Sequence, residues 1–204
     1  LRIGCSSQVE LKALELPLKR LKEHIPDVYP QVIIQDYFSL RSLFDNEQLD
    51  VLIGTKEMID KVHNCIFKKI KTVESYAIVS ENSILAQEKS ISFKKICEVP
   101  LIALHPRCIP FQYGNKLQEF ITLHAQQYLH FLCENDQSAI LLAKCNYGAA
   151  ILPEIYIPAH REGIVVLPFS EELKAIEYGI AYHRNLKEKH IKQFIQLFLE
   201  SEKI

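Results

Sequence analysis

The sequence predicts an α/β protein made of two lobes, and three observations support this fold class. Short apolar runs of strand length alternate with amphipathic segments of helical period, which is typical of parallel βαβ units. The middle of the chain repeats the pattern of its beginning. The length of 204 residues, with 48% hydrophobic and 24% charged residues, suits one large domain or two small lobes with a sizeable core.

The first lobe is predicted to begin with a buried strand at residues 1–5, followed by a helix that runs to about residue 24. Ser7 and Glu10 have the spacing of a capping box at the start of this helix. Apolar residues occupy more than one side of the helix, so we expect burial on two sides. Pro17 removes a backbone hydrogen bond and predicts a kink.

The elements that follow are read from the same periodicities. In the first half they are a strand at 32–34, a short helix that starts at Ser39, a strand at 51–54 and a strand at 72–80. In the second lobe they are a helical turn at 92–96, a strand at 101–104, a helix at 114–126, a strand at 128–133, a helix at 136–147, and strands at 149–152 and 165–167. A strand at 176–182 and an amphipathic helix end the chain, with Asn185 and Glu188 as a candidate capping box.

Composition narrows the function classes. The formal net charge of −1 gives no global electrostatic footprint for nucleic acid. The six cysteines stand singly, so we expect buried reduced thiols rather than a metal site, and no cofactor. No apolar run is long enough to span a membrane and no signal peptide is recognisable, so the expected location is the cytoplasm, without a membrane partner. A first residue other than Met leads us to expect a fragment or a processed product.

Several segments carry a family resemblance by their order and spacing. They are LRIG at 1–4, LPLKRLK at 16–22, YPQV at 29–32, LDVLI at 49–53, PLI at 100–102 and GAAILP at 148–153. Together they resemble the effector-binding domain of LysR-type transcriptional regulators over nearly the whole chain. Tyr147 departs from the small residues common in that family before the last motif, and residues 81–98 lack its histidine-proline-leucine segment. Both departures leave the ligand open.

The resemblance implies a two-lobed fold of the type 2 periplasmic-binding-protein kind with a double crossover. The expected boundaries are 1–73 with 176–204 for regulatory lobe I, and 74–175 for regulatory lobe II. It also implies that a winged helix-turn-helix DNA-binding domain precedes this region in the full protein and is absent from this chain. The expected partners are a small-molecule effector, a second copy of the chain in a homodimer or a tetramer, and DNA only through the missing domain.

The implied dimer is two-fold and antiparallel. It would set the first helix and the strand at 31–36 of one copy against residues 114–134 of the other. Such an isologous contact would bury the spare apolar stripes of both elements.

Candidate ligand-binding residues follow from the predicted sheets, because ligands of open α/β sheets bind beyond the carboxyl ends of strands. The expected site is an anion-friendly cleft between the lobes, where a helix N-terminus offers free N–H groups and a favourable dipole. The candidates in the first lobe are Ser6, Ser7, Gln8, Gly54 and Thr55, and those in the second are His105, Arg107, Asn135, Tyr147 and Ile151. Arg107 would clamp a carboxylate. The structural alternatives are helix capping for the serines, a turn for Thr55, solvated loop positions for His105 and Arg107, and core packing for Tyr147.

An enzyme is not expected, because none of the sequence motifs of nucleophile elbows, phosphate loops, dinucleotide sites or zinc proteases occurs. Two alternatives share the fold: a solute-binding protein of a transport system, and an enzyme that polymerises porphobilinogen or transfers phosphoribosyl groups. An export signal upstream would favour the former, and single cysteines argue against its oxidising compartment. The arginine- and aspartate-rich segments that such enzymes need do not follow the first strand.

Overall fold

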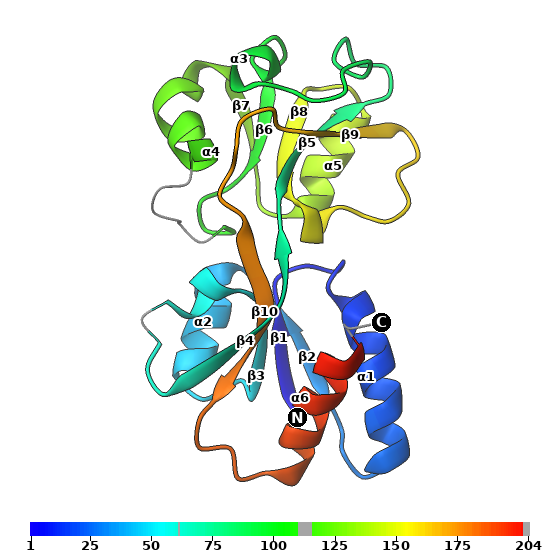
Figure 1. The fold of residues 1–204 in the computed structure, drawn as a ribbon, viewed down its shortest axis with the longest axis vertical. Coiled ribbons are helices and arrows are strands. Elements are labelled where there is room, and N and C mark those ends of the chain that lie inside the picture. Colours follow the sequence, from blue (N-terminus) through cyan, green and yellow to red (C-terminus); the bar gives the residue numbers. More distant parts are fainter. Residues whose placement is uncertain (61, 110–115, 202–204) are drawn as a thin grey trace. The chain divides into compact units, whose positions relative to one another are not determined.

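The computed structural model describes residues 1–60, 62–109 and 116–201 (Figure 1). The chain forms two compact units: unit 1 holds Leu1–Thr72 with Ile176–Ile204, and unit 2 holds Val73–Ala175. The chain thus leaves unit 1 once and returns once, so two connections join the units. Each unit is a mixed sheet with helices against it, as the predicted α/β class requires.

The sheet of unit 1 has the strand order β2-β1-β3-β10-β4 among the described residues. Its strands are β1 (Arg2–Cys5), β2 (Gln31–Ile34), β3 (Val51–Thr55), β4 (Cys65–Val73) and β10 (Ile176–His183). β1 pairs in parallel with β2 and β3, whereas β10 pairs antiparallel with β3. All of β3 is buried, as expected for a central strand that is covered on both faces.

Helices cover both faces of this sheet (Figure 1). They are α1 (Leu11–His24) and α6 (Lys189–Ser201), which pack against each other, α2 (Tyr37–Asp45), and the short 3₁₀ helix η1 (Lys56–Ile59). Leu52 of β3 packs with Leu40 and Phe44 of α2 in one cluster. Its neighbours Val51 and Ile53, also buried, point to the opposite face because side chains alternate along a strand.

Unit 2 contains the sheet order β7-β6-β8-β5-β9. Its strands are β5 (Ser75–Ser80), β6 (Leu101–Leu104), β7 (Leu129–Cys133), β8 (Ala149–Pro153) and β9 (Ile164–Pro168). β6 pairs in parallel with β7 and β8, and β5 pairs antiparallel with β8 and β9. Gly148 is required before β8 because a Cβ there would meet the carbonyl oxygen of Pro100.

The helices of unit 2 are short. They are α3 (Phe93–Ile96), α4 (Lys116–Glu119), the π-helical turn η2 (Phe120–His124), the 3₁₀ turns η3 (Gln126–Tyr128) and η4 (Glu154–Tyr156), and α5 (Asp136–Lys144). The core combines Ile96, Leu117 and Phe120 with Leu101 of β6 and Ile151 of β8. The predicted helix 114–126 is thus an α-helical turn followed by a π-helical turn, and its residues 114 and 115 lie outside the described residues.

Beyond the turn before α1, three predicted features were wrong. The strand at 72–80 is two strands, β4 and β5, and most of β4 was missed because its lysines obscure the period-2 signal of an edge strand. The second helix begins at Tyr37 rather than Ser39, because the carboxylate of Asp36 accepts the N–H groups of Phe38 and Ser39 at 3.0 and 3.1 Å.

The third error concerns the last helix. α6 begins at Lys189, so Asn185 and Glu188 both precede it and do not form the predicted box. The Glu188 carboxylate accepts the N–H of Lys187 at 3.2 Å instead.

Candidate ligand-binding site

The turn between β1 and α1 is a compact arrangement of backbone donors at the carboxyl end of β1. Ser7 Oγ accepts the N–H of Val9 at 3.1 Å. Hydrogen bonds of the 3₁₀ type then run from Leu11 to Gln8 and from Ala13 to Glu10, at 3.2 and 3.1 Å. The chain therefore turns through one tight loop before the α-helical pattern starts, and its first N–H groups are left for other acceptors.

A carboxylate of the chain itself takes those N–H groups. Glu10 Oε2 accepts the N–H of Ser6 at 2.7 Å, the N–H of Ser7 at 2.9 Å and the Ser6 hydroxyl at 3.1 Å. α1 begins at Leu11, so Ser7 and Glu10 both precede it and do not form the predicted capping box, although Glu10 accepts the Ser7 N–H as in that motif. The donors that the sequence assigned to a ligand anion are thus engaged by an internal anion.

Glu10 is unusual because its carboxyl group is almost completely buried. Only 3% of the residue is exposed, and its Oε1 has no hydrogen-bond partner among the described residues. Burial raises the pKa of Glu10 to about 7, against the hydrogen bonds from Ser6, Ser7 and Tyr178, which lower it. Near neutral pH this carboxyl group therefore exists in both protonation states.

Two further strands bring polar side chains to the same edge of the unit 1 sheet. Thr55 ends β3, is 5% exposed, and its Oγ1 has no partner among the described residues. Tyr178 of β10 lies directly opposite Thr55 in the antiparallel register, and its side chain hydrogen-bonds to Glu10. Lys71 Nζ of β4 lies 5.8 Å from the centre of the Tyr178 ring. This edge of the sheet therefore holds Ser6, Ser7 and Thr55, together with the hydrogen-bonded pair Glu10 and Tyr178.

The other unit 1 candidates are Gly54, in β3, and Gln8, in the turn before α1. Gly54 leaves room for Met58, because a Cβ on Gly54 would lie 2.2 Å from Met58 Sδ. Its backbone pairs with Gly179 inside the sheet. Gln8 is exposed on the turn.

In unit 2 the structure brings His105, Arg107 and Asn135 to one edge. β6 and β7 are parallel neighbours, so the residues after them lie together, and the His105 N–H donates to the Cys133 carbonyl at 2.8 Å. The Arg107 N–H donates to His105 Nδ1 at 3.2 Å. Asn135 caps α5, since its Oδ1 accepts the N–H of Ser138 at 2.8 Å.

The structure does not bring Tyr147 and Ile151 to that edge. β8 starts beside the first residue of β6, so Tyr147 lies at the opposite edge of the sheet, with its ring against Phe131. Ile151 is 5% exposed and belongs to the core cluster of unit 2. The sequence had grouped Tyr147 and Ile151 with His105, Arg107 and Asn135, and the parallel register of β6 and β8 places them apart.

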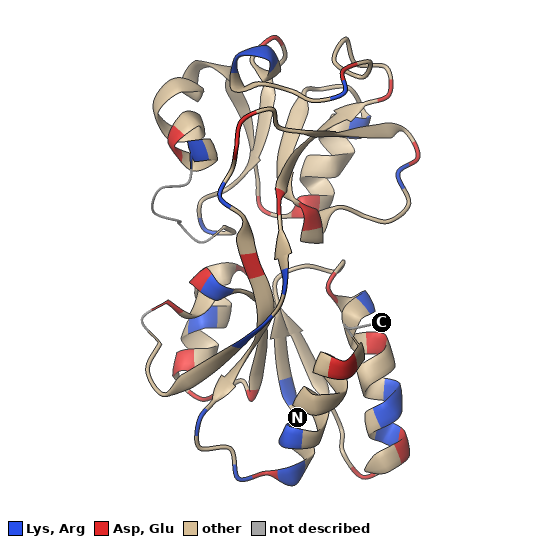
Figure 2. Ribbon diagram, viewed as in Figure 1, with Lys and Arg blue, Asp and Glu red and all other residues tan. Residues whose placement is uncertain are grey.

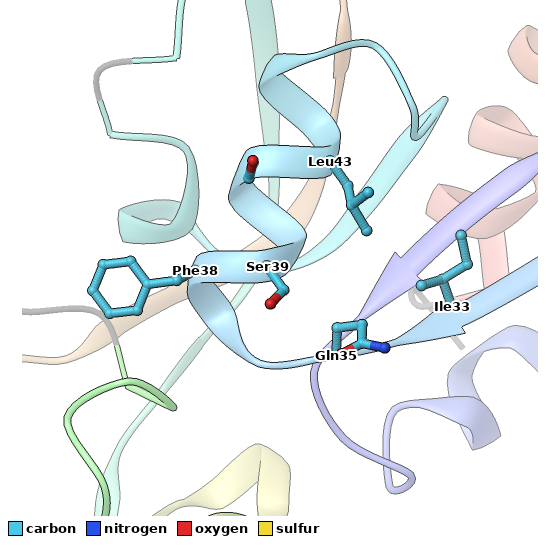
Figure 3. Close-up of a pocket in the computed structure, with 6 residues that line it drawn as sticks. Ile33, Gln35, Phe38, Ser39 and Leu43 are labelled. Carbon is cyan, nitrogen blue, oxygen red and sulfur yellow. The ribbon is translucent and has the colours of Figure 1, made fainter.

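A separate open pocket of about 490 Å³ lies on unit 1 between β2 and α2 (Figure 3). It is lined by Ile33, Gln35, Phe38, Ser39, Ser42 and Leu43. Ile33 and Leu43 point toward each other across it, whereas Phe38 points away (Figure 3). Its lining contains no ionisable side chain, and the Ser39 hydroxyl already donates to Asp36 at 2.7 Å, so it offers little to fix a polar ligand.

Other site types find no support in the described ranges. No three His, Cys, Asp or Glu side chains between residues 1 and 201, the undescribed stretches apart, are grouped to hold a metal. All six cysteines are free thiols, and burial raises the pKa of Cys5 to about 12. None of the described helices combines the length and the apolar run of a membrane span. Basic and acidic residues are interspersed over the helices of both units (Figure 2).

Sequence reasoning missed the chemistry of Glu10 and Tyr178. The signal for Glu10 was present in the capping-box spacing, which places a carboxylate on backbone donors. Tyr178 follows Ile176 by two residues and so shares its face, a pattern that predicts burial but not a hydroxyl contact with Glu10.

Comparison with known sequences gives one family. The family model of the LysR substrate binding domain matches residues 1–203. The malolactic fermentation system transcriptional activator of Lactococcus lactis subsp. lactis (strain IL1403) is 27% identical over 161 residues, which cover 78% of this chain and 54% of that protein. The chain thus spans about half the length of this curated relative.

Solved structures give the same fold. The effector-binding domain of QuiR in complex with shikimate has a TM-score of 0.79 at 18% identity, covering 100% of this chain and 96% of its own. The C-terminal domain of a probable LysR family regulator from Rhodococcus sp. RHA1 has a TM-score of 0.79 at 16% identity, covering 97% of each chain. The reduced OxyR regulatory domain from Pseudomonas aeruginosa has a TM-score of 0.76 at 14% identity, covering 100% and 96%.

Proposed function

The chain belongs to the family of LysR substrate-binding domains, and from this premise we propose that it senses a small carboxylate effector for a transcriptional regulator. The family and the two-sheet α/β fold make it the effector-binding domain of a LysR-type regulator, with the periplasmic-binding-protein-like architecture of its structural relatives.

The observation that supports a carboxylate effector is the carboxylate seat, the group of donors from Ser6 and Ser7 that holds the Glu10 carboxylate. Three donors, the N–H groups of Ser6 and Ser7 and the Ser6 hydroxyl, converge on one carboxylate oxygen. A turn with this geometry at the start of a helix favours a carboxylate from any source. Thr55 adds a buried hydroxyl at the same sheet edge. Shikimate, which is bound to the QuiR domain, is itself a hydroxylated carboxylic acid.

The unit 2 candidates His105, Arg107 and Asn135 stay predictions from the sequence. Arg107 is exposed, so a carboxylate could approach its guanidinium, whereas the Asn135 side chain is engaged in its cap. Tyr147 at the other edge of the sheet and Ile151 in the core of unit 2 have no part in the proposed site.

Self-association is the second part of the proposal. β2 and β7 are edge strands of their sheets, and edge strands invite pairing with another chain. Large apolar side chains are exposed on these two strands and on α1 and η2, namely Leu11, Leu16, Val32, Ile34, Leu123 and Leu132. We propose a two-fold dimer in which α1 and β2 of one copy face residues 116–133 of the other. A stable interface of this kind buries at least about 1,000 Å² in total.

The dimer is tested with single aspartates at exposed positions. Leu16→Asp and Leu132→Asp should each convert the dimer to monomers in analytical ultracentrifugation at high micromolar concentration. Phe120 is unsuitable for this purpose, because it is 8% exposed and belongs to the core of unit 2. Ile84→Asp, at a residue 72% exposed elsewhere on unit 2, is the control and should leave the mass unchanged. A monomeric unmodified chain, or a dimer that survives both variants, contradicts the arrangement.

The response to the effector would involve the whole regulator. We propose that a DNA-binding domain outside this chain responds to the effector, and that the protein acts in the cytoplasm, where six free thiols stay reduced. For the effector to change DNA affinity, it must bind two conformations of the regulator with different affinities.

The effector proposal is tested by thermal unfolding of the chain with acetate, benzoate and shikimate, with sodium chloride at matched ionic strength. A ligand that binds only the folded state at 100 times its Kd adds about 2.7 kcal/mol to the free energy of unfolding and raises the Tm. At least one carboxylate should raise the Tm, and Thr55→Val should weaken that effect while Thr72→Val, at an exposed threonine, should not. If no carboxylate raises the Tm at any pH from 5 to 8, the effector class is wrong.

A further inference from the structure

The carboxylate seat at the start of α1 is filled by the chain's own Glu10. The three hydrogen bonds that Ser6 and Ser7 donate to its carboxyl group end on Oε2, and the second oxygen, Oε1, is buried without a partner among the described residues. Thr55 Oγ1, 95% buried at the end of the neighbouring strand, is likewise unpartnered there. Two buried, unsatisfied polar atoms beside one filled seat are unusual, because natural proteins leave few such groups.

An external carboxylate cannot share this seat. The N–H groups of Ser6 and Ser7 each have one proton to donate, and both donate to Glu10. Two ionised carboxylates at hydrogen-bonding distance in a dry environment also repel each other strongly. A ligand carboxylate can therefore enter only if Glu10 leaves the seat or becomes neutral.

We propose that Glu10 is an internal competitor of the effector: its carboxylate holds the effector's seat, and effector binding displaces it with uptake of one proton. This inference rests on the proposed function, since it concerns the same turn. The displaced carboxyl group stays buried but loses the serine hydrogen bonds that lower its pKa, so it takes one proton from the solvent and forms an O–H bond; no other covalent bond changes. The internal carboxylate then lowers the affinity of the site for every anion, because an effector must compete with it for the same N–H groups.

The protonation of Glu10 sets how strongly it competes. Its pKa is raised to about 7 by burial, so the group is neutral below that pH and a weaker acceptor for the two N–H groups. The ionisable groups around it are Cys5 on β1, whose thiol stays neutral, and Tyr178 on β10, with Lys71 of β4 over the tyrosine ring. α6, which packs against α1, carries the ionisable residues Lys189, His190, Lys192 and Glu200 in its described part, whereas the main causes of the shift in the pKa of Glu10 are its burial and its hydrogen bonds with Ser6, Ser7 and Tyr178.

The expected signature is a pH-dependent affinity for carboxylates. Each pH unit above the pKa of Glu10 should weaken carboxylate binding about tenfold, because one proton must be taken up. Between pH 6 and pH 8 the apparent Kd should rise roughly tenfold for a pKa near 7. A neutral ligand should show no such dependence.

The test measures binding of acetate to the whole chain, with acetamide as the neutral isostere and sodium chloride at matched ionic strength. Apparent Kd values come from Tm shifts at pH 6 and pH 8, and proton uptake comes from calorimetry in two buffers of different ionisation enthalpy. The variants are Glu10→Gln, which keeps a neutral acceptor in the seat, and Glu10→Ala, which empties it. Glu57→Gln is the control, because Glu57 lies in η1 just after Thr55 and also has a buried oxygen without a partner among the described residues, yet Glu10 takes its hydrogen bonds from other residues.

In the wild-type chain and in Glu57→Gln, acetate should bind about tenfold more weakly at pH 8 than at pH 6, with uptake of about one proton at pH 8. Glu10→Gln and Glu10→Ala should bind acetate equally at both pH values, without proton uptake. Equal wild-type affinity at pH 6 and pH 8, or a pH dependence that survives in Glu10→Gln, overturns the inference alone. If acetate and the larger carboxylates fail to bind even to Glu10→Ala and to the wild type at pH 6, the seat takes no carboxylate and the proposed effector class falls with it.

Discussion

Two turns of this chain have the same place in their units and different chemistry. In unit 1, β1 leads through Ser6 and Ser7 into α1; in unit 2, β7 leads through Asn135 into α5. Both lie at the carboxyl end of a parallel strand, beside a neighbour of the same direction. Asn135 is exposed and caps its helix with a neutral amide oxygen, whereas the N–H groups of the unit 1 turn are held by a buried carboxylate.

The difference separates a structural cap from a candidate binding seat. A neutral cap near solvent satisfies donors at little cost and leaves nothing to titrate. A buried carboxylate loses hydration, and its three hydrogen bonds from the two serines offset that loss only in part, as the raised pKa of Glu10 reports. A turn that needed only a cap would not require this group, which is why the unit 1 turn carries the functional proposal.

The largest expected effect is on stability, from Glu10→Gln. The pKa of Glu10 is raised from 4.5 to about 7 on folding, so its contribution to stability is fully present below about pH 4.5 and is lost as the pH rises through 7. The glutamine side chain does not ionise, so the variant avoids this loss. It should be more stable than the wild type by up to about 3 kcal/mol at pH 8 and about equal to it at pH 4.5, measured by urea unfolding.

The control for this prediction is Glu15→Gln on the exposed face of the same helix. It removes the same charge without touching the turn and should give no comparable gain at pH 8. If the free energy of unfolding of the wild type does not change between pH 5 and pH 8, Glu10 does not titrate as proposed and the two turns do not differ in this respect.

An intermediate effect is expected from Asn135→Ala in unit 2. Loss of an N-cap side chain destabilises by about 1 kcal/mol, because the Ser138 N–H loses its acceptor. This loss should be the same at pH 5 and pH 8, in contrast to Glu10→Gln, when both are measured by urea unfolding. A cost that changes by more than half over that range would mean that the unit 2 turn also depends on an ionisable group.

The smallest expected effect is a gain from Thr55→Val. The Thr55 hydroxyl is buried without a partner among the described residues, so an isosteric methyl group should raise stability in urea unfolding by up to about 1 kcal/mol. The same variant should bind carboxylates more weakly, so the substitution should stabilise the fold and weaken the binding site. A loss of stability would show that the hydroxyl is satisfied in the folded chain and that it is not held for a ligand.

The fold was predictable where burial makes the pattern strong. β3, β6 and β8 are short, fully buried apolar runs, and each lies within one residue of its predicted range. β4 was missed because Lys68, Lys69 and Lys71 interrupt its alternation at the edge of the sheet. Asp36 was overlooked as a cap because Ser39, three residues later, also suits a helix start and in the structure bonds to Asp36.

The candidate site was predictable only in its local part. Ser6, Ser7 and Glu10 are close in sequence, so a spacing rule could relate them, although it could not say that Glu10 would be 97% buried. Tyr178 joins them from a strand far along the chain, and only the β3–β10 register places it opposite Thr55. Tyr147 was misplaced for the same reason, since its edge is decided by the parallel pairing of β6 and β8.

The most direct test of Glu10 as an internal competitor is a structure of the chain with a bound carboxylate at pH 6. We expect a carboxylate oxygen within about 2.7–3.2 Å of the backbone nitrogen of Ser6 or Ser7, with the Glu10 carboxyl group displaced from these two N–H groups. A ligand that stays more than about 4 Å from Ser6, Ser7 and Thr55, with the Glu10 carboxylate still bound to both N–H groups, would contradict it.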